Sequence, residues 1–414
     1  MRKRVILHAD MNNCYASIEV LHHPKLKGRP VAVGGSAEER HGIILAKNYE
    51  AKACGVQVGQ ALWQAKQKCP SLIIVPPDYD KYLRYSRLFR QILMDYSDQV
   101  EPFGIDESWV DVSGSLSLFG SGEQIANIIR ERVKYELGVT VSVGVSFNKI
   151  FAKLGSDIKK PDATTVISEE NYKNDIWPLP VGDLLGVGRA TKAKLERYRI
   201  KTIGQLAQAD PRLLQKWLGK WGLVLNRYAN GMDHSPVKTA SYESAVKSIG
   251  NSTTCPRDIK NEQDAHIVFQ NLSESVAERM RQLGLMAKTI QISLRSSDLY
   301  RFERQAELPS PSMISSELSQ AAMTLLGNSY KWDKPLRSVG IRGTNLVSIN
   351  GTRQLSLWED EPMRRQSEKM EYVIDDIRRR FGHHSIKRAL LITDQKLGKL
   401  DAKADHVIHP ISYS

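Results

Sequence analysis

The sequence predicts an α+β fold, because helix-like and strand-like segments mix along it without the regular strand–helix alternation of a doubly wound sheet. Apolar and polar residues alternate over 139–146, which is the period of a half-buried strand. Just before it, apolar residues at helical spacing predict a helix over 124–137. With 414 residues and 41% apolar content, the chain can bury several cores.

In the first part of the chain we expect short strands that end at turns with acidic residues. A strand at 4–10 ends in an aspartate, and residues 48–52 are typical of the opening of a helix. Two short strands are predicted within 100–113, on either side of the turn 104–108.

The second part of the chain returns to an α+β pattern between about 246 and 347. Proline-containing breaks at 177–180 and 233–236 separate it from the first part. The predicted elements are a helix at 261–283, a strand at 288–296, a helix at 312–327 and, in the tail, a charged amphipathic helix over 361–381.

Positive charge is concentrated in one region. The net charge is +13, and residues 185–240 alone carry eleven Lys or Arg against three acids. Within this region the turn at 185–189 resembles the helix-hairpin-helix element of DNA-handling proteins. Backbone N–H groups at Gly186 and Gly188 would approach a phosphate while Arg189 and Lys192 supply charge. The alternative is an ordinary glycine turn beside a solvated basic helix.

The cysteine content and the length of the apolar runs also indicate the cellular compartment. Four cysteines without a C-x-x-C pair are too few for a disulfide framework, which fits a reducing cytosol. No apolar run approaches the roughly 18 residues of a membrane helix. We therefore expect a cytoplasmic, nucleoid-associated protein without a membrane partner.

Three carboxylates stand at the ends of predicted strands. Asp10 ends the first strand, and Asp106 and Glu107 lie in the turn between two others. If these strands are neighbours, the carboxylates converge, and hard oxygen ligands select Mg²⁺ or Mn²⁺. Two such ions about 4 Å apart would support an in-line phosphoryl displacement. An isolated Asp-Glu pair, however, is more often simply solvated.

Several motifs together resemble those of Y-family translesion DNA polymerases, in the DNA polymerase IV (DinB-like) branch. They occur in family order, and the similarity covers roughly residues 4–345. The matching segments are 7–19, 47–52, 104–108, 142–149, 152–161, 186–188 and 247–250.

The resemblance implies a right-handed polymerase built from palm, fingers, helical thumb and little-finger domains. The expected boundaries are 1–13 and 78–167 for the palm, 14–77 for the fingers, 168–236 for the thumb with its helix-hairpin-helix, 237–246 for a linker, 247–347 for the little finger and 348–414 for a C-terminal tail.

It also implies roles for particular residues. Asp10, Asp106 and Glu107 would be catalytic and would bind two Mg²⁺, or Mn²⁺ as a substitute, with the Met11 carbonyl as a further ligand. Tyr15 would be the steric gate that excludes a ribose 2′-OH. The nucleotide triphosphate would be contacted by Tyr49, Lys52 and Lys160. Lys52 replaces a frequent Arg, and Ala46 replaces a hydroxyl residue, so the grip on the triphosphate is expected to be looser.

The tail contains a segment similar to the clamp-binding peptide of bacterial polymerases. The four residues concerned are Gln354, Leu355, Leu357 and Trp358. Its expected partner is a sliding clamp, alongside primer–template DNA and dNTPs. The alternative is a loop packed on the chain's own surface.

The sequence therefore predicts a monomeric, distributive and low-fidelity translesion DNA polymerase. One rival is a catalytically silent relative that binds DNA and the clamp. Retention of Asp10, Asp106, Glu107 and Tyr15 argues against it. Another rival, a different palm enzyme such as a nucleotidyl cyclase, would not need the basic region or the clamp-like peptide.

Overall fold

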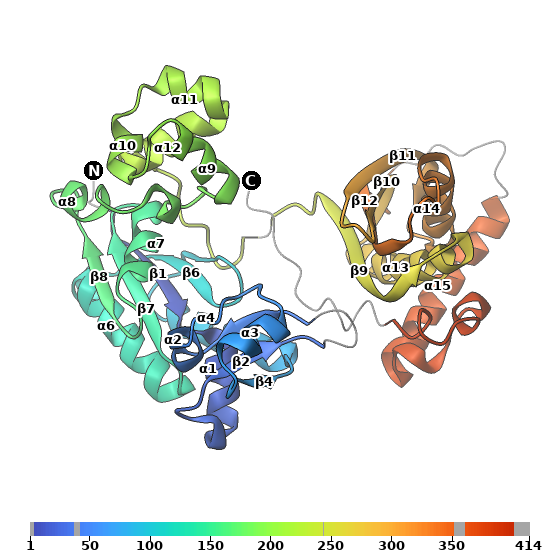
Figure 1. Cartoon of the computed structure of the whole chain (residues 1–414), viewed down its shortest axis with the longest axis horizontal. Coiled ribbons are helices and arrows are strands. Elements are labelled where there is room, and N and C mark those ends of the chain that lie inside the picture. The colour runs from blue at the N-terminus through green and yellow to red at the C-terminus, as the bar shows by residue number, and fades with distance from the viewer. Residues whose placement is uncertain (1–3, 37–41, 243, 352–360, 401–414) are drawn as a thin grey trace. The chain divides into compact units, whose positions relative to one another are not determined.

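The computed structural model describes residues 4–36, 42–242, 244–351 and 361–400 (Figure 1). The chain divides near residue 243 into a first unit, with the elements from Ile6 to Ala229, and a second unit, with those from Ser248 onward. None of the helices in the described ranges is long and apolar enough to cross a membrane. The clamp-like peptide at 354–358 lies outside the described residues.

A five-stranded sheet forms the centre of the first unit. The central strand β1 is antiparallel to β6 on one side and to β7 on the other, and β7 is parallel to β8. The strand order is β5 (Val100–Pro102), β6 (Glu107–Asp111), β1 (Ile6–Met11), β7 (Val141–Ser146) and β8 (Thr164–Ile167). The expected strands at 4–10, 100–113 and 139–146 are thus confirmed and are neighbours.

The two faces of this sheet are covered by different helices. Leu7, Ala9 and Met11 of β1 share a core with α4 (Tyr79–Met94) and α6 (Gly122–Arg132). The alternate residues Ile6 and His8 face α7 (Lys149–Ile158), where they meet Ala152 and Ser156. Because side chains alternate along a strand, Asp10 lies on the α7 face as well.

A smaller sheet and the helices around it precede α4. Strand β2 pairs with β3 in antiparallel fashion and with β4 in parallel fashion. Asn48 caps α2 by accepting from the Ala51 N–H, which explains the helix start predicted there. The elements are α1 (Cys14–His22), β2 (Val31–Gly34), β3 (Ile44–Lys47), α2 (Tyr49–Ala53), α3 (Leu62–Lys68) and β4 (Ile73–Val75).

The basic region is helical, as expected. Its helices share a core with Ile150, Phe151 and Leu154 of α7, so they are anchored to the central sheet. They are α9 (Arg189–Arg197), α10 (Ile203–Gln208), α11 (Pro211–Leu218) and α12 (Lys220–Ala229), and the short helix α8 (Tyr172–Ile176) precedes them.

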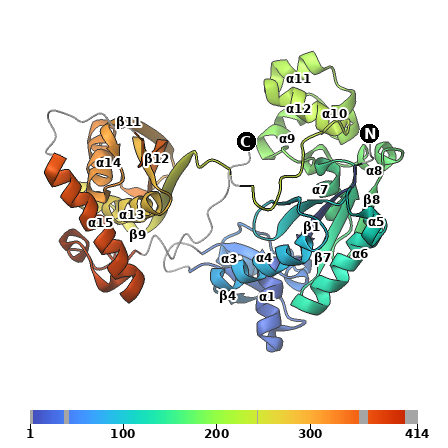
Figure 2. The same cartoon turned by 180° about the vertical axis from the view of Figure 1, so that it is seen from behind.

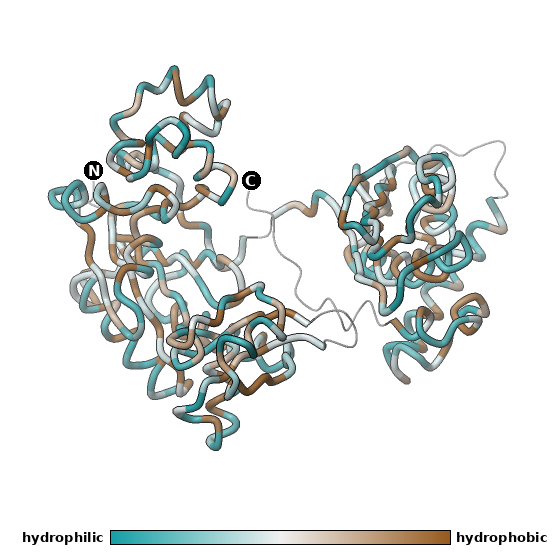
Figure 3. The backbone as a smooth tube through the Cα atoms, in the orientation of Figure 1, coloured by the Kyte–Doolittle hydropathy of each residue, from teal (hydrophilic) through white to brown (hydrophobic). Residues whose placement is uncertain are grey.

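The second unit is an antiparallel four-stranded sheet with two helices packed on it, and buried apolar residues of both share one core. Figure 3 shows hydrophobic stretches, in brown, along this part of the chain. The predicted helices and strand are confirmed. The order of the strands is β11 (Arg301–Ser312), β10 (Leu285–Ser296), β12 (Leu336–Ser348) and β9 (Ser248–Ile259), and the helices are α13 (Glu262–Gln282) and α14 (Ser315–Ser329).

The tail is part of the second unit. The predicted helix appears as α15 (Glu361–Phe381), followed by two 3₁₀ turns at 383–385 and 389–392. Leu391 and Leu397 enter the core beneath α13. Figures 1 and 2 show α15 beside α13 and α14, on the side away from the sheet.

Candidate active site and nucleic-acid interface

The pairing of β1 with β6 brings the three predicted carboxylates together. Asp10 lies directly opposite Glu107 in the antiparallel register, so their side chains emerge on the same face. The backbone N–H of Met11 donates to the Asp106 carbonyl at 3.0 Å, which holds Asp106 at the end of the same ladder. Asp10, Asp106 and Glu107 are called the carboxylate cluster below.

Burial makes the negative charge of this cluster costly. Asp10 is only 6% exposed, and burial together with the charge of Glu107 raises its pKa. Burial, followed by the charges of Asp10 and Glu107, raises the pKa of Asp106 to about 7. Like charges that cannot be hydrated disfavour one another's ionised form. The cluster therefore attracts cations.

Two lysines supply part of that positive charge. The Lys153 ammonium lies 2.6 Å from a Glu107 oxygen, and the Lys160 ammonium lies 2.8 Å from Asp10 Oδ2. Asp157 lies 2.9 Å from Lys160 and 3.7 Å from Lys153. Burial lowers the pKa of Lys160, but its contacts with Asp10 and Asp157 outweigh burial and raise it.

Sequence reasoning missed Lys153 and Asp157. A usable signal was present, because Lys149, Lys153 and Asp157 recur every four residues along α7 and so share one side of the helix. What the sequence did not show is that this side lies over the Asp10 face of β1.

His8 is another buried group that sequence reasoning missed. Its Nδ1 lies 2.8 Å from Ser156 Oγ, and its Nε2 lies 3.3 Å from Glu107 Oε2. Burial, and then the charge of Lys153, lower the pKa of His8 well below its ordinary value, so the ring stays neutral at pH 7. Its position two residues before Asp10 places it on the same face of β1.

The carboxylate cluster has the donors that a hard divalent cation prefers. Within the described ranges, no group of three or more His, Cys, Asp or Glu side chains is arranged to hold a metal ion. In this structure the lysine ammonium groups contact the carboxylate oxygens instead. Oxygen donors, burial and a raised Asp106 pKa together fit Mg²⁺ or Mn²⁺ in chemical terms.

Tyr15 lies in the first turn of α1, the helix that follows Asp10 along the chain. Its ring stacks on Tyr82 with centroids 4.3 Å apart and meets Tyr79 edge to face at 6.2 Å. Asn12 holds the preceding turn, since its amide donates to Ser142 Oγ and its Oδ1 accepts from the Asp162 N–H. The half-buried Tyr15 ring is thus fixed in position, and burial, followed by the charge of Asp106, raises the pKa of its hydroxyl.

The other residues expected to contact the nucleotide come from different elements. Tyr49 opens α2, and burial raises the pKa of its hydroxyl, with smaller opposing effects from the charges of Lys160 and Asp10. Lys52 is exposed, with its ammonium 5.7 Å from the centre of the Tyr49 ring. Of these three residues, Lys160 contacts Asp10 directly, and Lys52 lies beside Tyr49.

The glycine turn of the basic region opens α9. Gly186 has φ +89°, and a Cβ there would lie 2.6 Å from the Trp221 ring, so glycine is required on both counts. Gly188 is the N-cap of α9 and has no side-chain cap, and a Cβ there would meet open space. Arg189 and Lys192 are exposed on the following helix.

Three family models match most of the chain. The sequence matches the model of the impB/mucB/samB family over residues 9–157 and that family's C-terminal domain over 246–357. Residues 182–233 match a model described as the thumb domain of DNA polymerase-iota. These matches cover the central sheet, the basic helices and the second sheet.

Curated relatives match over nearly the whole length. The DNA polymerase IV of Acetivibrio thermocellus is 50% identical over 96% of this chain and 100% of its own length. That of Pelotomaculum thermopropionicum is 39% identical over 94% of this chain and 95% of its own. DNA polymerase IV 1 of Bacillus subtilis is 38% identical over 89% and 90%.

A solved structure has the same fold. It is a Y-family DNA polymerase chimera of Dbh and Dpo4, with a TM-score of 0.73, 23% identity, and coverage of 83% of this chain and 99% of that one. The predicted α+β polymerase fold is confirmed. By sequence and by fold, the chain belongs to the impB/mucB/samB family of Y-family DNA polymerases, in the DNA polymerase IV branch.

Proposed function

We propose that this chain is a template-directed DNA polymerase that performs translesion synthesis, transferring nucleotides from dNTPs to a primer 3′-hydroxyl. The observation that carries the proposal is the convergence of Asp10, Asp106 and Glu107 at the end of the β1–β6 ladder, where the fixed ring of Tyr15 follows β1 along the chain. A catalytically silent DNA-binding relative would have no need to keep this buried negative charge.

The carboxylate cluster, with the Met11 carbonyl, would hold two Mg²⁺ ions, or Mn²⁺ in their place. Such ions neutralise the charge that develops on the attacking and leaving oxygens. The three carboxylates would hold the ions in place, and burial of the carboxylate cluster excludes the water that would screen their charge. Lys153, whose ammonium lies 2.6 Å from Glu107, keeps that carboxylate oriented.

The triphosphate would lie on the Asp10 side of the site. We assign its contacts to the Tyr49 hydroxyl and to the ammonium groups of Lys52 and Lys160. Lys160 already lies 2.8 Å from Asp10, so one side chain can link the phosphates to the carboxylate cluster. Lysines grip as point charges and without the bidentate geometry of arginine.

Tyr15 would act as the steric gate. Stacking on Tyr82 and edge contact with Tyr79 prevent the ring from swinging away. A ring held in this way excludes a ribose 2′-OH by shape alone.

The parts of the fold would take the roles that the family suggests. We assign residues 1–13 and 78–167 to the palm, 14–77 to the fingers, 168–236 to the thumb, 237–246 to the linker and 247–347 to the little finger. In the thumb, the uncapped N-terminus of α9 at Gly188 and the cations Arg189 and Lys192 would bind backbone phosphates of the primer–template duplex.

The clamp-like peptide would tether the enzyme. We propose that Gln354, Leu355, Leu357 and Trp358 bind the sliding clamp of a bacterial cytoplasm, where the polymerase works as a monomer at the nucleoid. A tether raises the effective concentration of a weakly held polymerase at the primer end.

The test is primer extension by the purified full chain on an undamaged template and on a template with an abasic site, each with and without the host's clamp. We expect Mg²⁺-dependent extension on both templates, and longer products with the clamp. Failure on every template, with either Mg²⁺ or Mn²⁺, would establish the silent alternative instead.

A further inference from the structure

The Lys153 ammonium is surrounded by side chains of the candidate active site. It lies 2.6 Å from Glu107 Oε2, 3.7 Å from Asp157 and 4.0 Å from Asp10 Oδ2. It also lies 5.6 Å from the centre of the Phe103 ring, within the range of a cation–π attraction. The Lys153 side chain is only 15% exposed, so these side chains replace most of the water that would hydrate its charge.

The backbone of Lys153 is fixed by the packing of α7 on the central sheet. Helix α7 lies against β1 and β7 (Figure 1). A Cβ at Gly144 of β7 would lie 1.9 Å from the Ala152 carbonyl oxygen, so only glycine allows the helix to approach this closely. Ser156 Oγ donates to the Lys153 carbonyl at 2.7 Å. Lys153 is therefore directed at the carboxylate cluster by the fold and not by a flexible loop.

His8 lies beside the same carboxylate oxygen but adds no charge to it. Its Nε2 lies 3.3 Å from Glu107 Oε2 and, among the described residues, has no hydrogen-bond partner. Burial, and then the charge of Lys153, lower the pKa of His8 well below its ordinary value, so the ring stays neutral at pH 7. Within the part of the chain that the structure describes, Lys153 is thus the one cationic partner of Glu107.

Lys160 and Lys153 differ in what nucleotide binding would do to them. Lys160 is assigned to the triphosphate, whose oxygens would draw its ammonium away from Asp10. The contacts of Lys153 are with side chains of the site itself, so nucleotide binding does not release it. A divalent cation needs the carboxylate oxygen of Glu107 that Lys153 contacts, and like charges in a buried site oppose each other.

We propose that Lys153 is a tethered counter-ion of the carboxylate cluster, which holds Glu107 in the free chain and competes with a divalent cation for its oxygen. The inference rests on the metal-ion assignment made under Proposed function. To the orienting role of Lys153 given there, it adds control over how tightly the ions bind. The free chain would hold its cations weakly, and would bind them firmly only when a substrate supplies further oxygen ligands.

The test measures Mn²⁺ binding to the purified full chain, without DNA or dNTP, by electron paramagnetic resonance of the free ion. Lys153→Met removes the ammonium and keeps a side chain of similar shape. We expect it to bind Mn²⁺ at least about tenfold more tightly than the parent, because the competing positive charge is gone. Lys153→Arg keeps the charge and should bind Mn²⁺ no more tightly than the parent.

The matched control is Lys159→Met. Lys159 is the exposed C-cap residue of the same helix, so this variant removes an equal charge without touching Glu107. It should bind Mn²⁺ like the parent. A tightening that Lys159→Met shows to the same degree overturns the inference, because it would then reflect net charge alone.

The remaining outcomes separate the inference from the metal-ion assignment. If the parent binds Mn²⁺ and Lys153→Met binds it equally or more weakly, the competition is wrong and the metal-ion assignment stands. If neither chain binds Mn²⁺, the metal-ion assignment is wrong and the inference goes with it.

Thermal melting provides a second readout and checks folding. In EDTA, Lys153→Met should melt below the parent, since Glu107 has lost its charged partner, and Mn²⁺ should raise its melting temperature by more than it raises that of the parent. An equal rise in the two chains overturns the inference. If Lys153→Met does not fold, Lys153→Gln, whose neutral amide can still donate to Glu107, takes its place with the same expected tightening. Parent-like Mn²⁺ affinity in that folded variant also overturns the inference.

Discussion

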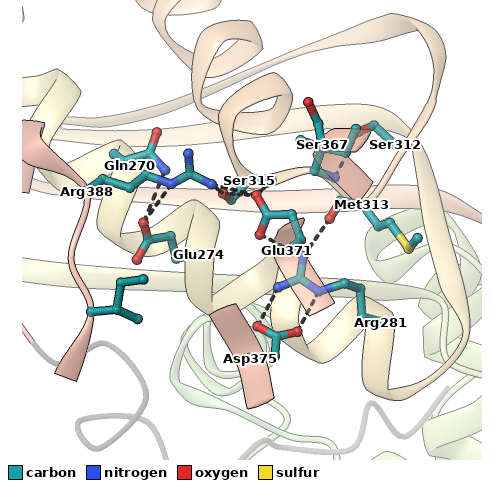
Figure 4. Close-up of polar contacts among 12 residues, drawn as sticks. Gln270, Glu274, Arg281, Ser312, Met313, Ser315, Ser367, Glu371, Asp375 and Arg388 are labelled. Carbon is teal, nitrogen blue, oxygen red and sulfur yellow. Dashed lines mark hydrogen bonds and ion pairs between the residues drawn. The ribbon is translucent and has the colours of Figure 1, made fainter. Parts of the chain in front are cut away.

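The carboxylate cluster of the first unit and the arginine network of the second both contain buried charges, yet these charges are matched differently. The arginine network consists of Arg281, Arg364, Arg378 and Arg388 with Glu274, Glu317, Glu371 and Asp375. Figure 4 shows the part of it around Arg281, Glu371 and Arg388. Around the cluster, the ammonium groups of Lys153 and Lys160 face four carboxylates, those of Asp10, Asp106, Glu107 and Asp157. In the network, four arginines face four carboxylates. The cluster is left with excess negative charge, whereas the network is neutral.

The pKa shifts follow this difference. Burial and neighbouring carboxylates raise the pKa of Asp106 to about 7, so its ionised form is disfavoured in the folded chain. Burial lowers the pKa of Arg281, but Asp375 and Glu371 outweigh burial and raise it. Ionisation is therefore opposed by the fold at the first site and supported at the second. This is the distinction expected between a site that awaits a cationic partner and one that is complete by itself.

The largest expected effect separates activity from stability. Asp106→Ala should reduce primer extension by about 1000-fold or more, since it removes a carboxylate that would face the reacting phosphate. Single-turnover extension in Mg²⁺ measures the rate, and fluorescence anisotropy should show primer–template affinity largely retained. Asp111→Asn, at the other end of β6, is the matched control and should extend normally. An undiminished rate in Asp106→Ala would remove the metal-site assignment.

The arginine network should give the opposite result. Arg281→Ala removes one of the two arginine partners of the buried Glu371 and the guanidinium partner of the half-buried Asp375, so we expect a loss of about 3 kcal/mol in the free energy of unfolding of the second unit. Denaturant titration measures it. Arg379→Ala, at an exposed arginine of α15, should cost about 0.5 kcal/mol or less. Equal stability of the two variants would show that the network does not hold the tail.

Tyr15 tests the catalytic site without changing its charge. Tyr15→Ala should raise ribonucleotide incorporation relative to deoxyribonucleotide by roughly 10- to 200-fold, the range available to a purely steric contact. Competing rNTP and dNTP kinetics measure the ratio. Tyr15→Phe keeps the ring and should retain the parent preference, and an unchanged sugar preference in Tyr15→Ala would refute the gate.

The raised pKa of Asp106 predicts a pH-dependent stability difference. In the folded chain the pKa of Asp106 is about 7, above its ordinary value of 3.8. The stability that this carboxyl group contributes is therefore fully present below about pH 4 and is lost as pH rises through 7. In EDTA, Asp106→Asn should therefore be more stable than wild type above pH 7, by roughly 1–3 kcal/mol. Thermal melts between pH 5 and 9 measure the difference. A gap that does not grow with pH would mean that Asp106 is not crowded by the other carboxylates.

The smallest effect concerns charges that are not buried at all. Arg189→Ala and Lys192→Ala should each weaken DNA binding a few-fold and each reduce the salt slope of log K by about 1. Affinities measured from 50 to 300 mM salt give the slope. A parent-like slope in both variants would place the duplex away from α9, and Lys173→Ala, outside the glycine turn, serves as the control.

Much of the fold could be predicted from local patterns. The strand at 139–146, the helices of the second unit and α15 all follow from periodicity, because alternation and helical spacing reflect which side chains a local element can bury. The convergence of Asp10 with Asp106 and Glu107 was expected only on the condition that their strands are neighbours, and the β1–β6 pairing satisfies it. The domain boundaries and the roles of the site residues stay predictions.

Other parts could not be predicted. His8, Lys153 and Asp157 gather around the carboxylates because α7 packs on one face of β1, and a register between a helix and a strand leaves little trace in the sequence of either. In α15 the usual rule gives the wrong side, because apolar residues that normally mark a buried face lie outward there.

By itself, the sequence determined the fold class, the order of the elements, the motifs of the family and the basic region, since these depend on residue type and short-range spacing. Tertiary structure alone decided which buried charges are matched. The carboxylate of Asp106 lies among other carboxylates, whereas that of Glu371 forms an ion pair with a guanidinium. Which of the two occurs depends on contacts between segments about a hundred residues apart. Electrostatic free energy at such sites is set by distance and burial, and neither quantity is written in the local sequence.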